Sequence, residues 1–203
     1  MTIEEIDLHR MGMEELAKYL PEQGCDECGA ATAAQMAEKL ISGDCQASGC
    51  TRIAASLAEK IDKVLSINIH LPESDPAMQK VRERLIEVNA PDESSPVLLT
   101  SNSIITIRIL KLVLETTGTK AFLVPVDTIG YTVDNAVHES KFTPMAVMRA
   151  LTDSGILSRS SSRRAVIPGL AADQKGTIER VTRWSLEVGP VSGFELPLYL
   201  VTR

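Results

Sequence analysis

Four cysteines gathered in one short stretch are the residues best suited to chemistry in this sequence. They lie between Cys25 and Cys50 in the pattern Cys-x2-Cys-x16-Cys-x4-Cys, and the rest of the 203-residue chain contains none. Thiols gathered this closely in a reducing compartment indicate a metal site rather than disulfides. The two-residue gap between Cys25 and Cys28 lets both sulfurs face one metal. Clustering of unrelated cysteines by chance is the competing interpretation.

A second group of candidate residues follows short apolar runs later in the chain. These turns carry hydroxyl, amide and carboxylate side chains, together with glycine, which lets the backbone approach a ligand closely. The candidates are Thr100, Ser101, Asn102, Asp127, Thr128, Gly130, Thr132, Pro168, Gly169, Gly189 and Pro190. Strand-to-helix turns use the same residue types as caps, so the pattern alone leaves a ligand site and a purely structural turn both open.

The apolar runs before these turns alternate with amphipathic stretches. Strands are predicted at 97–100, 121–126, 165–167 and 185–188, and helices at 103–115, 132–138, 143–154 and 172–183. This alternation is typical of parallel strands covered by helices. Ligands of such sheets bind beyond the carboxyl ends of the strands, which is where the candidate residues stand.

The cysteine-rich part of the chain is predicted to be helical, because apolar residues repeat there every three or four positions. Helices are expected at 14–20, 32–41, 53–64 and 77–88, the second of them capped by Thr32. Proline, serine and acidic residues make 89–96 the expected linker.

The sequence therefore predicts an α/β protein built from two domains. A small helical metal-cluster domain is expected at 1–66, a helical connection and linker at 67–95, and an α/β domain with a mainly parallel sheet at 96–203.

Composition excludes several classes of function. A net charge of -6 and an aromatic content of 3% offer neither a basic face nor stacking rings to a nucleic acid. Acidic residues in the first 20 positions argue against a signal peptide, and no apolar run is long enough to cross a membrane. We therefore expect a cytoplasmic protein. The sequence also lacks a Walker loop and a Gly-x-Gly-x-x-Gly fingerprint.

Several stretches resemble the large (gamma) subunit of the corrinoid iron–sulfur protein of the acetyl-CoA synthase/CO dehydrogenase system. Leu20-Pro-Glu-Gln-Gly-Cys25-Asp-Glu-Cys28-Gly is similar to the start of its iron–sulfur domain. The stretches similar to its corrinoid-binding domain are Pro96-Val-Leu-Leu-Thr-Ser-Asn102, Phe122-Leu-Val-Pro-Val-Asp127-Thr-Ile-Gly130, Ser140-Lys-Phe-Thr143, Val166-Ile-Pro-Gly169 and Val188-Gly-Pro190. The similarity extends over 14–66 and 96–200.

The resemblance implies two cofactors. A [4Fe–4S] cluster is expected on Cys25, Cys28, Cys45 and Cys50, with zinc on the same thiolates as the alternative. The family places its third cluster cysteine where Ala33 stands, and Cys45 would supply the missing thiolate. A cobalamin-type corrinoid is expected at the strand ends, with Thr128 matching the family threonine beneath the cobalt.

The function implied by the resemblance is methyl transfer, or electron transfer to a corrinoid cobalt, in the acetyl-CoA pathway. The chain would then be a methyl carrier or methyltransferase component whose partner is a corrinoid methyltransferase or a reductive-activation protein. Family members carry a large (β/α) barrel between the two matching ends, where this chain has only 67–95. That difference favours the alternative, a zinc-binding or metal-free interaction module without corrinoid.

Overall fold

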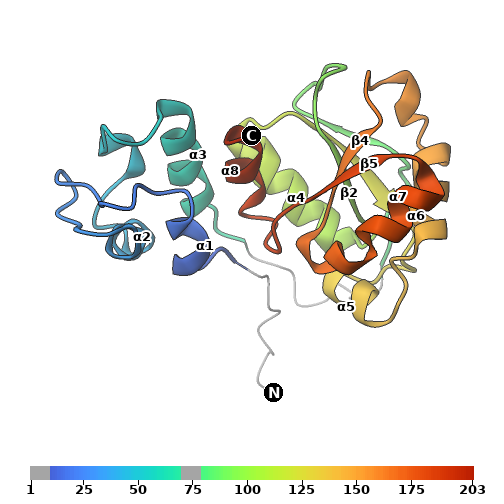
Figure 1. Cartoon of the computed structure of the whole chain (residues 1–203), viewed down its shortest axis with the longest axis horizontal. Coiled ribbons are helices and arrows are strands. Elements are labelled where there is room, and N and C mark those ends of the chain that lie inside the picture. The colour runs from blue at the N-terminus through green and yellow to red at the C-terminus, as the bar shows by residue number, and fades with distance from the viewer. Residues whose placement is uncertain (1–9, 70–78) are drawn as a thin grey trace. The chain divides into compact units, whose positions relative to one another are not determined.

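The computed structural model of the protein describes residues 10–69 and 79–203 (Figure 1). Expectations for 1–9 and 70–78, which include the start of the predicted helix at 77–88, concern residues outside these ranges. The chain divides into two compact units. The first contains the chain up to Ile67 together with Ser192–Arg203, and the second contains Asn68–Val191.

The second unit is built on a sheet of five strands among the described residues. These are β1 (Ile86–Val88), β2 (Val97–Ser101), β3 (Ala121–Val126), β4 (Arg164–Ile167) and β5 (Ser185–Val188), in the order β1-β3-β2-β4-β5. Strands β2 to β5 run parallel, and only β1 pairs antiparallel, along the outer edge of β3. The predicted α/β fold with a mainly parallel sheet is confirmed.

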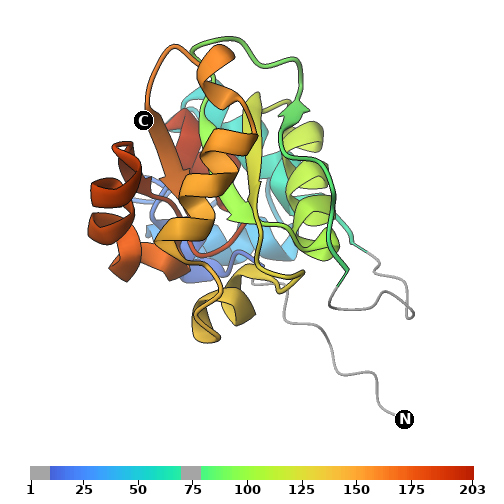
Figure 2. The same ribbon diagram turned by 90° about the vertical axis from the view of Figure 1, so that its right-hand side faces the viewer.

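Helices cover both faces of this sheet (Figure 2). Helix α4 lies on one face, and α6 and α7 lie on the other. The helical elements of the unit are α4 (Ile104–Thr117), α5 (Val133–His138), α6 (Pro144–Asp153), η2 (Ile156–Ser158), η3 (Gly169–Gln174) and α7 (Lys175–Thr182). Because β2 and β3 are covered on both sides, every one of their residues is buried and their sequences read as continuous apolar runs.

The predicted helix at 77–88 is wrong over its described part. Residues 81–85 are irregular, Lys80 forms an isolated bridge with Ser103, and Ile86–Val88 is a strand. Two β-branched residues, Ile86 and Val88, pair with Leu123 and Ala121 of β3, so an open sheet edge overrides the helical spacing.

The expected linker at 89–96 is a packed turn between β1 and β2. The side-chain amide of Asn89 donates 2.8 Å hydrogen bonds to the carbonyls of Leu114 and Thr119, at the end of α4 and just beyond it. The turn also contacts the loop before β4, where the Ser161 N–H donates to the Glu93 carbonyl over 3.0 Å. Residues 89–95 therefore belong to the second unit, whereas the sequence predicts a separate connection and linker at 67–95.

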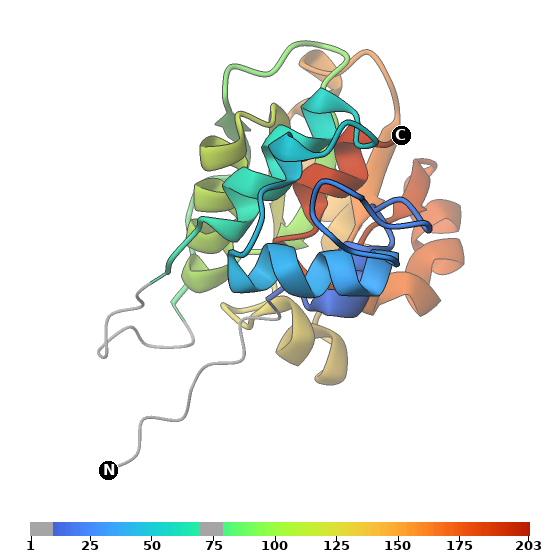
Figure 3. The ribbon, with the colours of Figure 1, turned by 90° about the vertical axis from the view of Figure 1, so that its left-hand side faces the viewer.

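The first unit contains helices from both ends of the chain (Figure 3). They are α1 (Met13–Ala17), α2 (Ala33–Ser42), η1 (Ala47–Gly49), α3 (Ala55–Leu65) and α8 (Leu196–Val201). Helix α8 packs against α3, which is why Ser192–Arg203 belongs here and not to the α/β domain expected at 96–203. The Thr32 cap is confirmed, since its hydroxyl accepts a 3.2 Å hydrogen bond from the Gln35 N–H. No helix in the described ranges combines the length and apolar character needed to span a membrane.

Candidate functional site

The loop that carries the first two cysteines is closed by backbone hydrogen bonds. Cys25 and Ala30 exchange two of them, at 2.8 and 3.0 Å. Gly24 enters this loop with a left-handed φ of +65°, and a Cβ there would lie 2.0 Å from the Ala30 carbonyl oxygen. Only glycine fits such a position, so the tight turn that presents Cys25 and Cys28 depends on it.

The other two cysteines flank the short η1 helix, which α3 holds in place. The Asp62 carboxylate accepts hydrogen bonds from the Ala47 N–H (2.6 Å) and the Ser48 N–H (3.0 Å). These bonds fix the backbone midway between Cys45 and Cys50.

Two basic side chains tie the cysteine loops to neighbouring segments. The Lys39 ammonium of α2 donates to the carbonyls of Cys28 (2.7 Å) and Gly29 (3.0 Å). Arg52, two residues after Cys50, forms a 3.2 Å ion pair with Asp26. The first contact holds the loop against α2, and the second holds it against the segment after Cys50.

The structure places the four predicted cysteine ligands near one another. Cys45 lies beside Cys28, Cys28 beside Cys25, and Cys25 beside Cys50. Burial is the main reason why the pKa values of Cys25 and Cys28 are raised. Burial and the bond to Cys28 raise the pKa of Cys45 to about 11. Four free thiols near one another form a donor set that suits iron–sulfur clusters and zinc.

A carboxylate that the sequence reasoning did not single out also faces this set. Glu27 accepts hydrogen bonds from the Cys25 thiol and the Thr51 hydroxyl, both at 2.9 Å. The bond from Cys25 is the main reason why the pKa of Glu27 is lowered. Ligand atoms of Cys25, Glu27 and Cys50 all lie within 4.8 Å of one another. The one sequence feature that could have indicated Glu27 is its position between Cys25 and Cys28.

The second group of candidates lies along one edge of the sheet. Because β2 to β5 are parallel, their carboxyl ends meet there, as predicted. At the end of β2, the hydroxyls of Thr100, Ser101 and Ser103 are buried and have no hydrogen-bond partner within the described ranges. Such groups are rare in folded proteins, since a buried polar atom without a partner costs free energy.

Asn102 organises the turn that follows β3. Its side-chain oxygen accepts from the N–H groups of Thr128 and Gly130, both at 3.1 Å, and from the Thr128 hydroxyl at 3.0 Å. Its amide nitrogen donates to Asp127 over 2.9 Å, and the same Asp127 oxygen accepts from the Ile129 N–H over 3.1 Å. Both side-chain groups of Asn102 are therefore used inside the protein.

Thr128 does not present its side chain at the sheet edge. The residue is 0% exposed, and its hydroxyl contacts the Tyr131 carbonyl at 2.9 Å as well as Asn102. Thr132, four residues on, is the N-cap residue of α5, and its hydroxyl accepts from the Asn135 amide over 3.1 Å.

The glycines after β4 and β5 face each other. A Cβ on Gly169 would lie 2.8 Å from the Gly189 carbonyl oxygen, and one on Gly189 would lie 2.7 Å from a Val166 methyl. The Gly169 N–H donates to the Pro190 carbonyl over 3.0 Å, which joins the Pro168 and Pro190 turns. Close approach of two strand ends thus accounts for both glycines.

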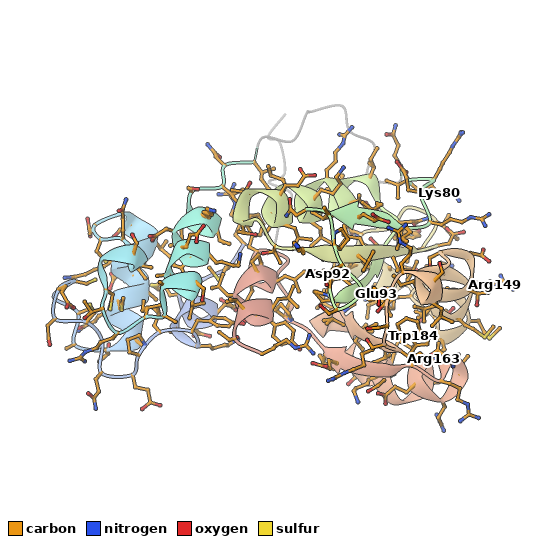
Figure 4. All side chains as sticks on the ribbon, turned by 90° about the horizontal axis from the view of Figure 1, so that it is seen from above. Lys80, Asp92, Glu93, Arg149, Arg163 and Trp184 are labelled. Atoms are coloured by element: carbon orange, nitrogen blue, oxygen red, sulfur yellow. The ribbon has the colours of Figure 1, made fainter. Side chains whose placement is uncertain are left out.

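Lys80 is a further residue at this edge that the sequence reasoning missed (Figure 4). Its ammonium lies 3.7 Å from Asp127, since 79–81 cross the end of β2. Burial raises the pKa of Asp127, but hydrogen bonds from the Ile129 N–H and Asn102, with Lys80 nearby, outweigh it and lower that pKa. No periodicity in the sequence indicates this contact.

Comparison with known proteins gives one family. The family described as CO dehydrogenase/acetyl-CoA synthase delta subunit matches residues 34–199. The match includes Cys45, Cys50 and strands β2 to β5, and it begins after Cys25 and Cys28.

Curated relatives carry related names. The acetyl-CoA decarbonylase/synthase complex subunit gamma of Methanopyrus kandleri is 36% identical over 122 residues, which are 60% of this chain and 26% of the relative. The same subunit of Methanothermobacter thermautotrophicus is 34% identical over 122 residues, 60% and 27% of the two chains. The corrinoid/iron-sulfur protein large subunit of Moorella thermoacetica is 32% identical over 111 residues, 55% and 25% of the two chains.

The chain spans about a quarter of the length of these relatives. Their names confirm the resemblance predicted from the sequence. Since the family match extends over more than half of the chain, the protein belongs to the CO dehydrogenase/acetyl-CoA synthase delta subunit family.

Proposed function

We propose that this chain binds a metal cluster and a corrinoid, and acts in methyl transfer or in electron transfer to a corrinoid cobalt. The observation that carries the proposal is that four free cysteines lie near one another, with ligand atoms of Cys25, Glu27 and Cys50 within 4.8 Å of one another. In this proposal Cys45 replaces the ligand that the family would place at Ala33.

The corrinoid part of the proposal rests on the strand-end edge. Three buried hydroxyls there, those of Thr100, Ser101 and Ser103, have no partner among the described residues, and a ligand at the edge would supply one. The residues that would hold it are Thr100, Ser101, Asn102, Asp127, Thr128, Gly130, Thr132, Pro168, Gly169, Gly189 and Pro190.

The roles of the two cofactors follow from their chemistry. A bound corrinoid supplies the cobalt that carries a methyl group, and a [4Fe–4S] cluster supplies an electron that returns oxidised cobalt to its reactive state. The cysteine thiolates would hold the cluster, while the strand-end turns would orient the corrinoid. Because relatives are named as subunits of a complex, we infer a protein partner, a corrinoid methyltransferase or a reductive-activation protein in the cytoplasm.

A second candidate function follows from the segment between the two matching ends. The family's barrel has no counterpart in 67–95, which favours a zinc-binding or metal-free interaction module without corrinoid. Four thiolates suit tetrahedral zinc as well as a cluster.

An absorbance spectrum with metal analysis of anaerobically purified protein separates the two. We expect a broad sulfur-to-iron charge-transfer band, with iron and sulfide in equal amounts, and heat on titration of the full chain with aquocobalamin. Zinc without iron would favour the zinc-binding interaction module. If the folded chain gives neither heat nor a spectral shift with aquocobalamin, the proposal that it binds a corrinoid is wrong.

A further inference from the structure

The carboxylate of Glu27 is turned toward two cysteines, although the residue lies at the protein surface. One of its oxygens accepts a 2.9 Å hydrogen bond from the Cys25 thiol, and ligand atoms of Cys25, Glu27 and Cys50 all lie within 4.8 Å of one another. Within residues 10–69 and 79–203, no other three histidine, cysteine or acidic side chains gather so closely. The tightest group of donor atoms in the cysteine-rich region therefore includes a carboxylate.

The other cysteine loop holds the second oxygen of Glu27. This oxygen accepts a 2.9 Å hydrogen bond from the hydroxyl of Thr51, the residue that follows Cys50. Cys25 and Cys50 are buried whereas Glu27 is exposed, so the carboxylate lies where the group borders on solvent. Water satisfies an exposed carboxylate and a thiol is a weak donor, so hydrogen bonding alone gives little reason for this orientation.

Two thiolates and a carboxylate are ligands that zinc accepts together. Zinc binds cysteine sulfur at about 2.3 Å and carboxylate oxygen at about 2.0–2.2 Å. Ligand atoms of one tetrahedral ion are consequently about 3.5–3.8 Å apart, a spacing that this group reaches through small side-chain movements. Entry of the ion releases the Cys25 thiol proton to water, which frees the Glu27 oxygen that accepts it in the metal-free protein.

We propose that Glu27 is a ligand of a single zinc ion, held together with the thiolates of Cys25 and Cys50. This inference rests on the metal centre of the proposed function and concerns its zinc-loaded form. A third thiolate, from Cys28 or Cys45, which lie beside each other, completes the four positions. A [4Fe–4S] cluster takes four thiolates, so the carboxylate is a ligand only of the single ion.

X-ray absorption at the zinc edge tests the ligand set in the full chain, loaded anaerobically with zinc alone. We expect three sulfur neighbours and one oxygen neighbour in wild type. Glu27→Cys offers a sulfur in place of the oxygen, so its zinc should have four sulfur neighbours. Glu22→Gln, at another exposed acidic residue near the first cysteine loop, is the matched control and should leave the wild-type set unchanged.

Competition with a chelator separates a ligand from a nearby charge. Glu27→Ala should weaken zinc binding about 100-fold or more, since loss of even a supporting contact at a metal site costs about 10–100-fold. Glu27→Cys should recover most of that affinity, because it restores a donor. The melting temperature of the metal-free chain should stay within about 2 °C of wild type in both variants, as for most surface substitutions.

The outcomes distinguish this inference from the proposed function. If wild type binds neither zinc nor iron, the proposed metal centre itself is wrong. If wild type binds zinc through four sulfur atoms, or Glu27→Ala keeps or gains affinity, the centre stands and the role of Glu27 is wrong. An oxygen neighbour that persists in Glu27→Cys belongs to water and likewise excludes Glu27. Weaker zinc binding with a lower melting temperature of the metal-free chain also contradicts the inference, since it indicates a structural role.

Discussion

The hydroxyl of Tyr19 donates a 2.9 Å hydrogen bond to the carboxylate of Glu195, although 176 positions separate the two residues in the sequence. Glu195 is buried and stands directly before α8, while Tyr19 follows α1. Burial, followed by this bond to a carboxylate, raises the pKa of Tyr19. The contact thus joins the two separate segments that build the first unit.

Tyr19→Phe should destabilise the first unit. The substitution leaves the buried Glu195 carboxylate without this donor, at a cost of about 1–3 kcal/mol in the free energy of unfolding. Denaturant unfolding measures it. Tyr199→Phe removes a hydroxyl from α8 and is the control, with an expected change within about 0.5 kcal/mol. Equal effects of the two substitutions would contradict a specific role for the bond.

Cys45→Ala should release the metal. The proposed site counts Cys45, which lies beside Cys28, as one of its four donors, and a four-thiolate site loses affinity when one ligand is lost. Iron, sulfide and zinc content after desalting measures the effect. Gln46→Ala, at the neighbouring exposed position, should retain the metal. Full metal content in the cysteine variant would exclude Cys45 as a ligand.

Asp62→Ala should weaken metal binding without removing any ligand. The Asp62 carboxylate holds the N–H groups of Ala47 and Ser48 between the second pair of cysteines. Loss of a supporting contact of this kind typically lowers metal affinity about 10–100-fold. Competition with a chelator measures it. Asp62→Asn keeps one acceptor oxygen and should lie between wild type and alanine, while Glu59→Ala on the same helix should leave affinity unchanged.

Asp127 should make the second unit sensitive to acid. Its pKa is lowered below the ordinary 3.8, so the charged carboxylate stabilises the fold above about pH 4. That contribution is lost as the pH falls through the pKa of the folded state. Thermal melts between about pH 5 and pH 2 should therefore show wild type converging on Asp127→Asn. Asp134→Asn, at an exposed position of α5, is the comparison variant.

The sheet could largely be predicted because its central strands are nearly continuous apolar runs. Leu98 and Leu123 stand in such runs, and burial on both faces requires them. The Thr32 cap could be predicted as well, since a hydroxyl at that position satisfies an N–H of the first turn.

Elements that depend on distant partners could not be predicted. Ile86–Val88 has helical spacing in the sequence and becomes a strand only because the edge of β3 is open. Helix α8 was missed because its six residues are too few for a periodic signal, and α3 stabilises it. Glu27 was missed for a similar reason, since its proximity to Cys50 appears only after the loops fold.

Because Ser192–Arg203 completes the first unit, the second unit is an insertion within the first along the chain. Ribosomes make proteins from the amino end, so every residue of Asn68–Val191 is synthesised before α8 exists. The second unit can consequently fold during translation, whereas the first stays open along one side of α3 until α8 has left the ribosome. The unit that carries all four cysteines is thus completed after the second unit.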